Sequence, residues 1–188
     1  MDQRQVLIVL AVLAAVIVVA AIGFFLSRKR RSQKLRERFG PEYDRVLKKE
    51  GEVRRAEGVL QIRAQRRDKF QILSLSSSLH NDFNQRWLVV QSHFVDDPKG
   101  SVSQADQLVN EVMQARGYPV ADFEQRASDL SVDHPAVVEN YRAAHDIALR
   151  HGRGQASTED LRKAMVHYRT LFDELLGFDV PVRKEARA

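Results

Sequence analysis

The chain has no cysteine among its 188 residues, and no segment sustains a two-residue alternation of apolar and polar side chains. Without cysteine the protein can form neither a disulfide bond nor a thiolate nucleophile. This absence is compatible with a reducing compartment and equally with an exported protein that lacks disulfides. The one candidate strand, residues 70–75, is short. The apolar spacing elsewhere is helical, so the sequence predicts helices rather than a sheet.

Familiar catalytic and phosphate-binding motifs are also missing. The sequence contains no Walker loop, no nucleophile elbow and no HExxH zinc motif. Six histidines are present, and no two of them stand four residues apart, the spacing that places two imidazoles on one metal. We therefore expect a protein that is not an enzyme, with no catalytic residue, no cofactor and no metal site.

One dipeptide, His145-Asp146, matches part of the metal site of the HD phosphohydrolases. That site also needs an earlier histidine and a later aspartate, for which His93 and Asp173 are the nominees. The helical spacing around the dipeptide instead predicts a half-buried histidine beside a solvated aspartate. We favour this second interpretation.

Two further groups have a structural explanation that outweighs a functional one. Asp96 and Asp97 form a carboxylate pair, but Pro98 follows them and suits the first position of a helix, so capping explains them better than acid–base chemistry. Phe83 and Trp87 belong to an apolar stripe with helical spacing. This stripe predicts a bundle core rather than a ligand pocket.

Residues 6–26 form an unbroken run of 21 uncharged and mostly aliphatic residues. At about 1.5 Å per residue, a helix of this length spans about 31 Å, close to the hydrocarbon thickness of a bilayer. The run is longer than the apolar part of a signal peptide, and no cleavage site follows it. We therefore expect an uncleaved transmembrane helix.

Positive charge is concentrated directly after this run. Arg4 alone precedes it, whereas seven basic residues follow within twelve positions. Because Lys and Arg resist translocation, the asymmetry predicts an N-terminus outside the cell and a cytoplasmic C-terminal domain. We interpret the cluster as a contact with the membrane surface that fixes the orientation of the protein in the bilayer. The alternative is that the cluster also binds anionic headgroups or a regulatory ligand. Its residues are Arg28, Lys29, Arg30, Arg31 and Lys34.

The formal charge of +5 does not extend to the rest of the chain. Residues 1–38 carry a net charge of +6, residues 39–188 a net charge of −1, and residues 71–188 a net charge of −4. A nucleic-acid-binding domain is expected to present a basic face of its own. Nucleic acid is therefore excluded as an expected partner.

Beyond residue 74 the apolar residues recur at steps of three and four, which predicts helices with one buried face each. Asp97-Pro98 begins one helix, and Gly117 ends it. Ser157 and Asp160 form a shortened capping box at the start of the last helix. A bundle of about four to five helices is expected.

Residues 27–73 differ in kind, because they are dense in charge of both signs. Gly40-Pro41 is expected to break this segment into two helices. Gly51 and Gly58 weaken the second piece by about 1 kcal/mol each relative to alanine, which argues against a long rigid coiled coil. The apolar residues of the segment are spaced too sparsely for a buried helix, so we expect a charged helical stalk. The sparsely spaced apolar residues are Leu35, Phe39, Tyr43, Leu47, Val53 and Leu60.

The predicted fold is all-α, with a transmembrane helix, a charged stalk and a small bundle. The expected boundaries are a short extracytoplasmic N-terminus over residues 1–5, the transmembrane helix over 6–26, the basic juxtamembrane segment and stalk over 27–73, the helical bundle over 74–177 and a flexible tail over 178–188.

Three stretches resemble the marks of a bacterial family of small membrane-anchored proteins with the same order of anchor, stalk and helical domain. They are residues 35–43 (LRERFGPEY), 94–98 (FVDDP) and 116–119 (RGYP). The resemblance implies a bacterial inner-membrane location and an architecture, and it implies no activity, cofactor or catalytic residue.

The leading hypothesis for function is a non-enzymatic, membrane-tethered adaptor whose helical domain binds a protein partner, through a bundle face or the stalk. A membrane-bound hydrolase or ligand sensor that uses His145 and Asp146 is the first alternative. A self-associating structural membrane protein is the second. The expected partners are thus the lipid bilayer, with its anionic headgroups, and an unknown protein.

Overall fold

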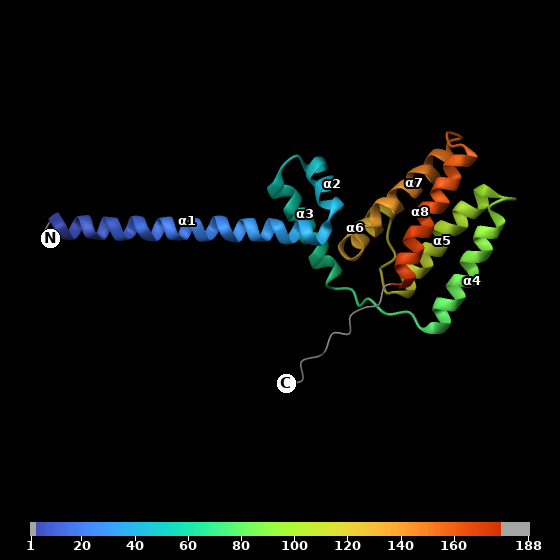
Figure 1. The fold of residues 1–188 in the computed structure, drawn as a ribbon, viewed down its shortest axis with the longest axis horizontal. Helices are drawn as coiled ribbons and strands as arrows, with labels where there is room; N and C mark the ends of the chain where they lie inside the picture. Colours follow the sequence, from blue (N-terminus) through green and yellow to red (C-terminus); the bar gives the residue numbers. More distant parts are fainter. Residues whose placement is uncertain (1–2, 178–188) are drawn as a thin grey trace.

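The computed structural model describes the backbone of residues 3–177, and the side chains of residue 13 and residues 16–177. Within this part all regular structure is helical, as predicted, and no strand is present. The helix α1 (Gln3–Phe39) projects from a body that the shorter helices form (Figure 1). The tail expected over residues 178–188 lies outside the described residues.

No helix in the described part of the chain has an apolar stretch long enough to cross a membrane. By this finding the transmembrane helix predicted over residues 6–26 is wrong. The single-pass topology inferred from this helix, and the inner-membrane location that the resemblance implied, are corrected with it.

Two short helices, α2 (Pro41–Glu50) and α3 (Val53–Arg67), fold back against the end of α1. We call the end of α1 from Leu35, together with α2 and α3, the N-terminal lobe. The predicted break at Gly40-Pro41 is confirmed: Gly40 has a φ of 47° and Pro41 begins α2. A positive φ suits glycine, because glycine lacks the Cβ that makes a positive φ energetically unfavourable for other residues.

The N-terminal lobe is found where we expected a charged helical stalk over residues 27–73. Phe39, Tyr43 and Leu60 are buried in a core of their own. Their spacing was too sparse to predict burial within one helix. The end of α1 shares this core with α2, α3 and Val132 of α6, so two or three apolar residues from each of the first three helices are enough to fill it. The buried members are Leu35, Phe39, Tyr43, Val46, Ala56, Leu60, Ala64 and Val132.

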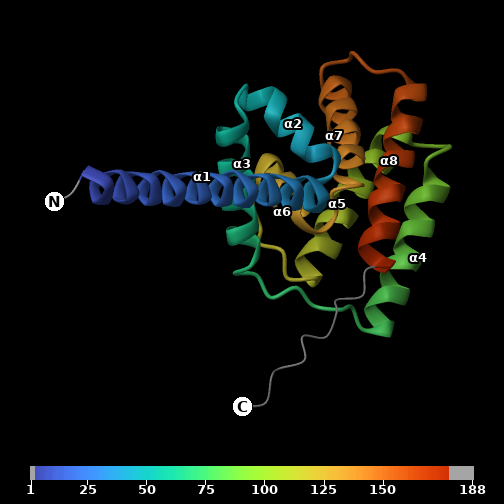
Figure 2. The same ribbon diagram turned by 60° about the vertical axis from the view of Figure 1, so that its left-hand side comes forward.

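The helical bundle is confirmed. It contains α4 (Ser77–His93), α5 (Pro98–Ala115), α7 (Val138–Gly152) and α8 (Thr158–Gly177), which lie alongside one another (Figure 2). Trp87 of α4 stacks on Phe172 of α8 with 4.6 Å between the ring centroids. The expected apolar stripe of α4 therefore faces the core. The predicted caps are also present: Asp97 accepts from the Gly100 amide at 2.9 Å, and the Ser157 amide donates to Asp160 at the same distance.

The short helix α6 (Phe123–Asp133) connects the two parts. Its Ala127 and Leu130 are buried in the bundle core, whereas its Val132 is buried in the core of the N-terminal lobe. The chain itself passes from α3 to α4 through a linker, residues 68–76, without helical structure beyond a turn. In that linker the Leu73 amide donates to the carbonyl of Arg116 at 2.9 Å.

Candidate functional site

The residues nominated for a hydrolase do not come together. His145 stacks on Phe123 with 3.5 Å between ring centroids, and burial lowers its pKa from the ordinary value. Asp146 points to solvent, where it accepts from Arg150 at 3.1 Å. Asp173 is likewise exposed, 3.6 Å from Arg169. Among the described residues, no three His, Asp or Glu side chains are arranged to hold a metal ion.

The interior of the bundle contains a polar network that sequence reasoning missed. Tyr168 donates to Asp106 at 3.0 Å, Asn110 donates to the other oxygen of Asp106 at 3.2 Å, and Tyr141 donates to Asn110 at 3.2 Å. Arg126 donates to the Tyr141 hydroxyl at 2.9 Å. Burial raises the pKa of Tyr141 to about 12 and that of Tyr168 further. These hydroxyls are occupied in joining α5, α6, α7 and α8, and this role is structural.

The most prominent cavities described lie where α1 leaves the N-terminal lobe. Two cavities there, one of 590 Å³ and one of 740 Å³, are each lined by residues of both α1 and α3. We call the two together the cationic crevice. The first cavity is lined by Gly23, Leu26, Ser27, Arg30, Arg31, Lys34, Leu35 and Gln61. The second is lined by Phe24, Ser27, Arg28, Arg31, Arg54, Glu57 and Gly58.

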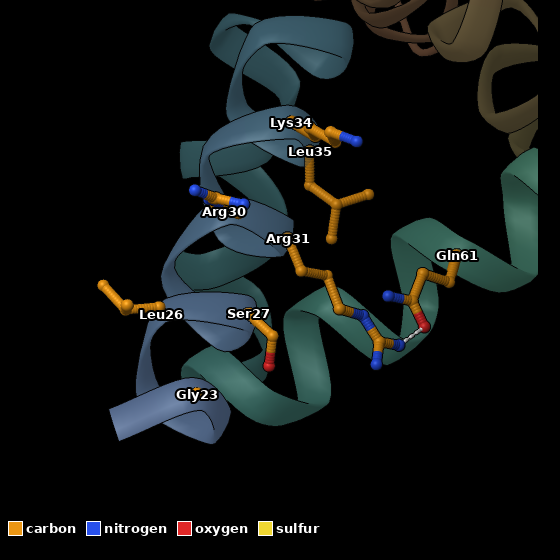
Figure 3. A pocket seen from close by; sticks show the side chains of 8 residues that line it. All are labelled: Gly23, Leu26, Ser27, Arg30, Arg31, Lys34, Leu35 and Gln61. Atoms are coloured by element: carbon orange, nitrogen blue, oxygen red, sulfur yellow. Dashed lines mark hydrogen bonds between the residues drawn. The ribbon is translucent and has the colours of Figure 1, made fainter. Parts of the chain in front are cut away.

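Arg31 stands at the centre of the crevice because it lines both cavities. Its side chain reaches across from α1 and donates to Oε1 of Gln61 on α3 (Figure 3). Gln61 carries no charge, so this bond does not neutralise Arg31, and no carboxylate in the described part of the chain forms an ion pair with it. The buried wall between the helices is supplied by Leu35.

The cations of the crevice differ from the arginines further along α3. Arg63, Arg66 and Arg67 each form an ion pair, at 2.7, 3.1 and 2.6 Å. By contrast, none of the crevice cations has a carboxylate partner within the described residues. The crevice cations are Arg28, Arg30, Arg31, Lys34 and Arg54. The one carboxylate that lines the crevice, Glu57, is 8% exposed and accepts from Tyr43 at 3.2 Å. The crevice therefore carries a local excess of positive charge.

An apolar surface borders the crevice on the side away from the body. Ile22, Phe24, Phe25 and Leu26 of α1 are each more than half exposed. Contiguous apolar surface of this kind marks an interaction site. The arrangement can bind an anionic group that is flanked by apolar ones.

Sequence reasoning found only half of this site. It singled out Arg28, Lys29, Arg30, Arg31 and Lys34 as one cluster on one helix, and their assignment to a membrane surface stays a prediction. Arg54, Glu57 and Gln61 on the opposite wall were missed. The spacing of Ala56, Leu60 and Ala64 could have indicated that α3 packs through one face, and thus that its neighbours flank a partner helix.

No protein-family model, no curated protein and no solved structure matches this chain. The resemblance to a bacterial family of small anchored proteins thus stays a prediction.

Proposed function

We propose that the protein is a non-enzymatic adaptor, and that its cationic crevice binds an acidic segment of a protein partner. The observation that supports this is a set of five cations around one crevice that have no carboxylate partner within the described residues, next to a lobe in which Arg63, Arg66 and Arg67 are all paired. Charged groups left unpaired on a surface are available to a complementary partner, and they steer its approach.

The chemistry of the partner follows from the two surfaces that meet there. Carboxylates would face Arg30, Arg31 and Lys34, while apolar side chains next to them would cover Phe25 and Leu26. A single exposed ion pair contributes about 0–1 kcal/mol, so several pairs and some apolar burial must act together. Binding of this type weakens as salt screens the charges.

The hydrolase alternative lacks geometric support, because His145 and Asp146 face different surroundings. Self-association through the crevice would bring like charges together, which is unfavourable. An anionic lipid offers the right charge, and it is the occupant that the experiment must distinguish from a protein.

The test is site-specific photo-crosslinking in cells from two positions on the full-length chain. A photoreactive residue replaces Gln61 in the crevice, or Gln104 on α5 as the control site. We expect an adduct with a second protein from position 61 that is missing from position 104, and an acidic segment at the crosslinked site.

The charge dependence of this adduct decides whether the crevice cations hold the partner. The substitutions Arg30→Gln, Arg31→Gln and Lys34→Gln, made together, should abolish it. A matched triple variant at the exposed lysines of the same lobe and its linker, Lys48→Gln, Lys49→Gln and Lys69→Gln, should preserve it. The proposal would be contradicted if the adducts form only with lipid or only with a second copy of this chain. An equal yield of the adduct in both triple variants would also contradict it.

A further inference from the structure

The joint between the N-terminal lobe and the bundle is made largely of ion pairs. On α3, Arg66 donates to Asp129 at 3.1 Å, and Arg67 donates to both carboxylate oxygens of Asp133, at 2.8 and 2.6 Å. Arg63 lies on the same face of α3, three and four residues before them, and donates to Ser131 at 3.3 Å. A continuous arginine stripe on α3 thus faces the acidic side of α6.

A buried carboxylate completes this joint. Oε1 of Glu42 on α2 accepts from Arg63 at 2.7 Å and from Arg142 of α7 at 3.0 Å, and the Glu42 side chain is fully buried. Apolar contact adds little from the bundle side, because Val132 is the one residue of α6 among the buried members of the lobe's core.

The joint is incompletely satisfied. Oε2 of Glu42 and Oδ2 of Asp129 are buried and have no hydrogen-bond partner among the residues that the structure describes. Burial raises the pKa of Asp129 despite the nearby Arg66, so desolvation outweighs the ion pair at that carboxyl. Burying a charge costs desolvation free energy, which is recovered only when every lone pair of the group accepts a hydrogen bond. The two carboxylates do not meet this condition. Opening would return all of these groups to water.

The chain allows such an opening without unfolding either part. Each part has its own hydrophobic core, and the linker of residues 68–76 connects them. Ile72 of this linker is buried in the bundle core and the Leu73 amide is bonded to Arg116, so only residues 68–71 lie ahead of the anchored part. Separation would expose Val132 and leave the remaining buried members of both cores in place.

From these observations we propose that the contact of α3 with α6 is an ionic latch, which opens reversibly and turns the N-terminal lobe on residues 68–71 while both cores stay folded. In the closed state Asp129 and Asp133 occupy the arginine stripe of α3. In the open state this stripe is free, and it extends the positive surface of the same helix that carries Arg54 in the crevice. The last consequence, a larger surface for an acidic partner, rests on the proposed function.

The latch itself is tested by a distance between the two parts. The chain has no cysteine, so Lys48→Cys on α2 and Lys163→Cys on α8, both exposed, give a unique pair of spin-label sites. We expect a single distance at low salt. A second, longer distance should appear at about 1 M salt, where screening is strongest, and in the variant Asp129→Asn with Asp133→Asn.

A charge exchange controls for nonspecific damage. Arg66→Asp alone and Asp129→Arg alone should each populate the longer distance, and the two combined should restore the short one. One unchanged distance in all variants and at all salt concentrations, with loss only when the whole chain unfolds, would overturn the latch.

The consequence for binding has a separate readout, the affinity for a ten-residue polyglutamate peptide. We expect the Asn double variant to bind this probe at least about tenfold more tightly than the wild type, a difference of about 1.4 kcal/mol. If the Asn double variant shows the longer spin-label distance but binds the peptide as tightly as the wild type, the latch is supported and the larger binding surface is contradicted. No binding by either protein, with a lengthened distance, would count against the proposed function and not against the latch.

Discussion

Arg142 on α7 donates a hydrogen bond to Oε1 of Glu42 on α2 at 3.0 Å, although the two residues are 100 positions apart in the chain. Arg142 is 8% exposed and Glu42 is fully buried. This bond ties the N-terminal lobe directly to the bundle and does not pass through α6. Glu42 thus forms a second tie between the two parts, in addition to the contact of α3 with α6.

Replacing Glu42 by Gln should strongly destabilise the protein. The amide keeps the shape of the side chain but leaves Arg63 and Arg142 without the carboxylate that they share. Removing one partner from a buried ion pair typically costs about 3–5 kcal/mol. Urea denaturation measures the loss in the free energy of unfolding. The control is Glu111→Gln, which removes a surface pair with Arg86 and should cost no more than about 1 kcal/mol.

Two glycine substitutions should have opposite effects on stability. Gly117 has a φ of 90°, and a Cβ there would lie 2.3 Å from the carbonyl oxygen of Gln71. Gly117→Ala should therefore lower the free energy of unfolding by about 1–3 kcal/mol or more. Gly58 lies within α3 and has nothing within 4 Å of such a Cβ. Gly58→Ala should raise stability by about 1 kcal/mol, because alanine favours a helix. Thermal melts of both variants check this, and an equal shift of the same sign would refute it.

The structure also predicts that stability falls at alkaline pH. Burial raises the pKa of Tyr118 and Tyr168 well above the ordinary value of 10 and that of Tyr141 to about 12. An unfolded tyrosine loses its proton near pH 10, whereas these folded ones keep theirs. Their stabilising effect is complete below pH 10 and is lost as the pH rises through the folded pKa values. Urea denaturation over a pH series should show a falling free energy of unfolding above about pH 10. Tyr168→Phe should reduce this slope, and an identical slope would argue against the buried network.

A second pH effect is expected on the acid side, from His134. Its side chain is buried, and burial lowers its pKa, although Nδ1 lies 3.1 Å from Oε1 of Glu174. Desolvation outweighs that carboxylate because Glu174 is 45% exposed and therefore well solvated. The contribution of His134 is present above its unfolded pKa of about 6.5 and is lost as the pH falls through the lower folded value. The free energy of unfolding should decrease below about pH 6.5. His134→Gln should flatten this decrease, and no change in the slope would contradict the assignment.

Local signals in the sequence were sufficient to predict much of the fold. Asp97-Pro98, the capping box at Ser157 and the break at Gly40-Pro41 all act within a few residues, and the structure places helix ends at each of them. Apolar steps of three and four likewise identified the bundle helices, because each has one face in a common core.

The N-terminal lobe could not be predicted in the same way. Its core joins residues such as Phe39 and Leu60, which are about twenty positions apart and on different helices. Its ion pairs are even more remote, since Arg66 and Asp129 are separated by 63 residues. A segment rich in both charges is expected to be solvated unless the pairing partners are known. The opposite wall of the crevice was missed for this same reason.

The most direct test of the account is the affinity of the crosslinked acidic segment, made as a synthetic peptide, for the full-length protein at several salt concentrations. Three ion pairs at about 0.3–1 kcal/mol each predict that the Arg30, Arg31 and Lys34 triple variant loses about five- to 150-fold in affinity. The triple variant at Lys48, Lys49 and Lys69 should stay within about twofold of the wild type. Affinity of the wild type should fall steadily with salt. Equal loss in both variants, or an affinity that does not depend on salt, would contradict the claim that the unpaired cations of the crevice hold an acidic partner.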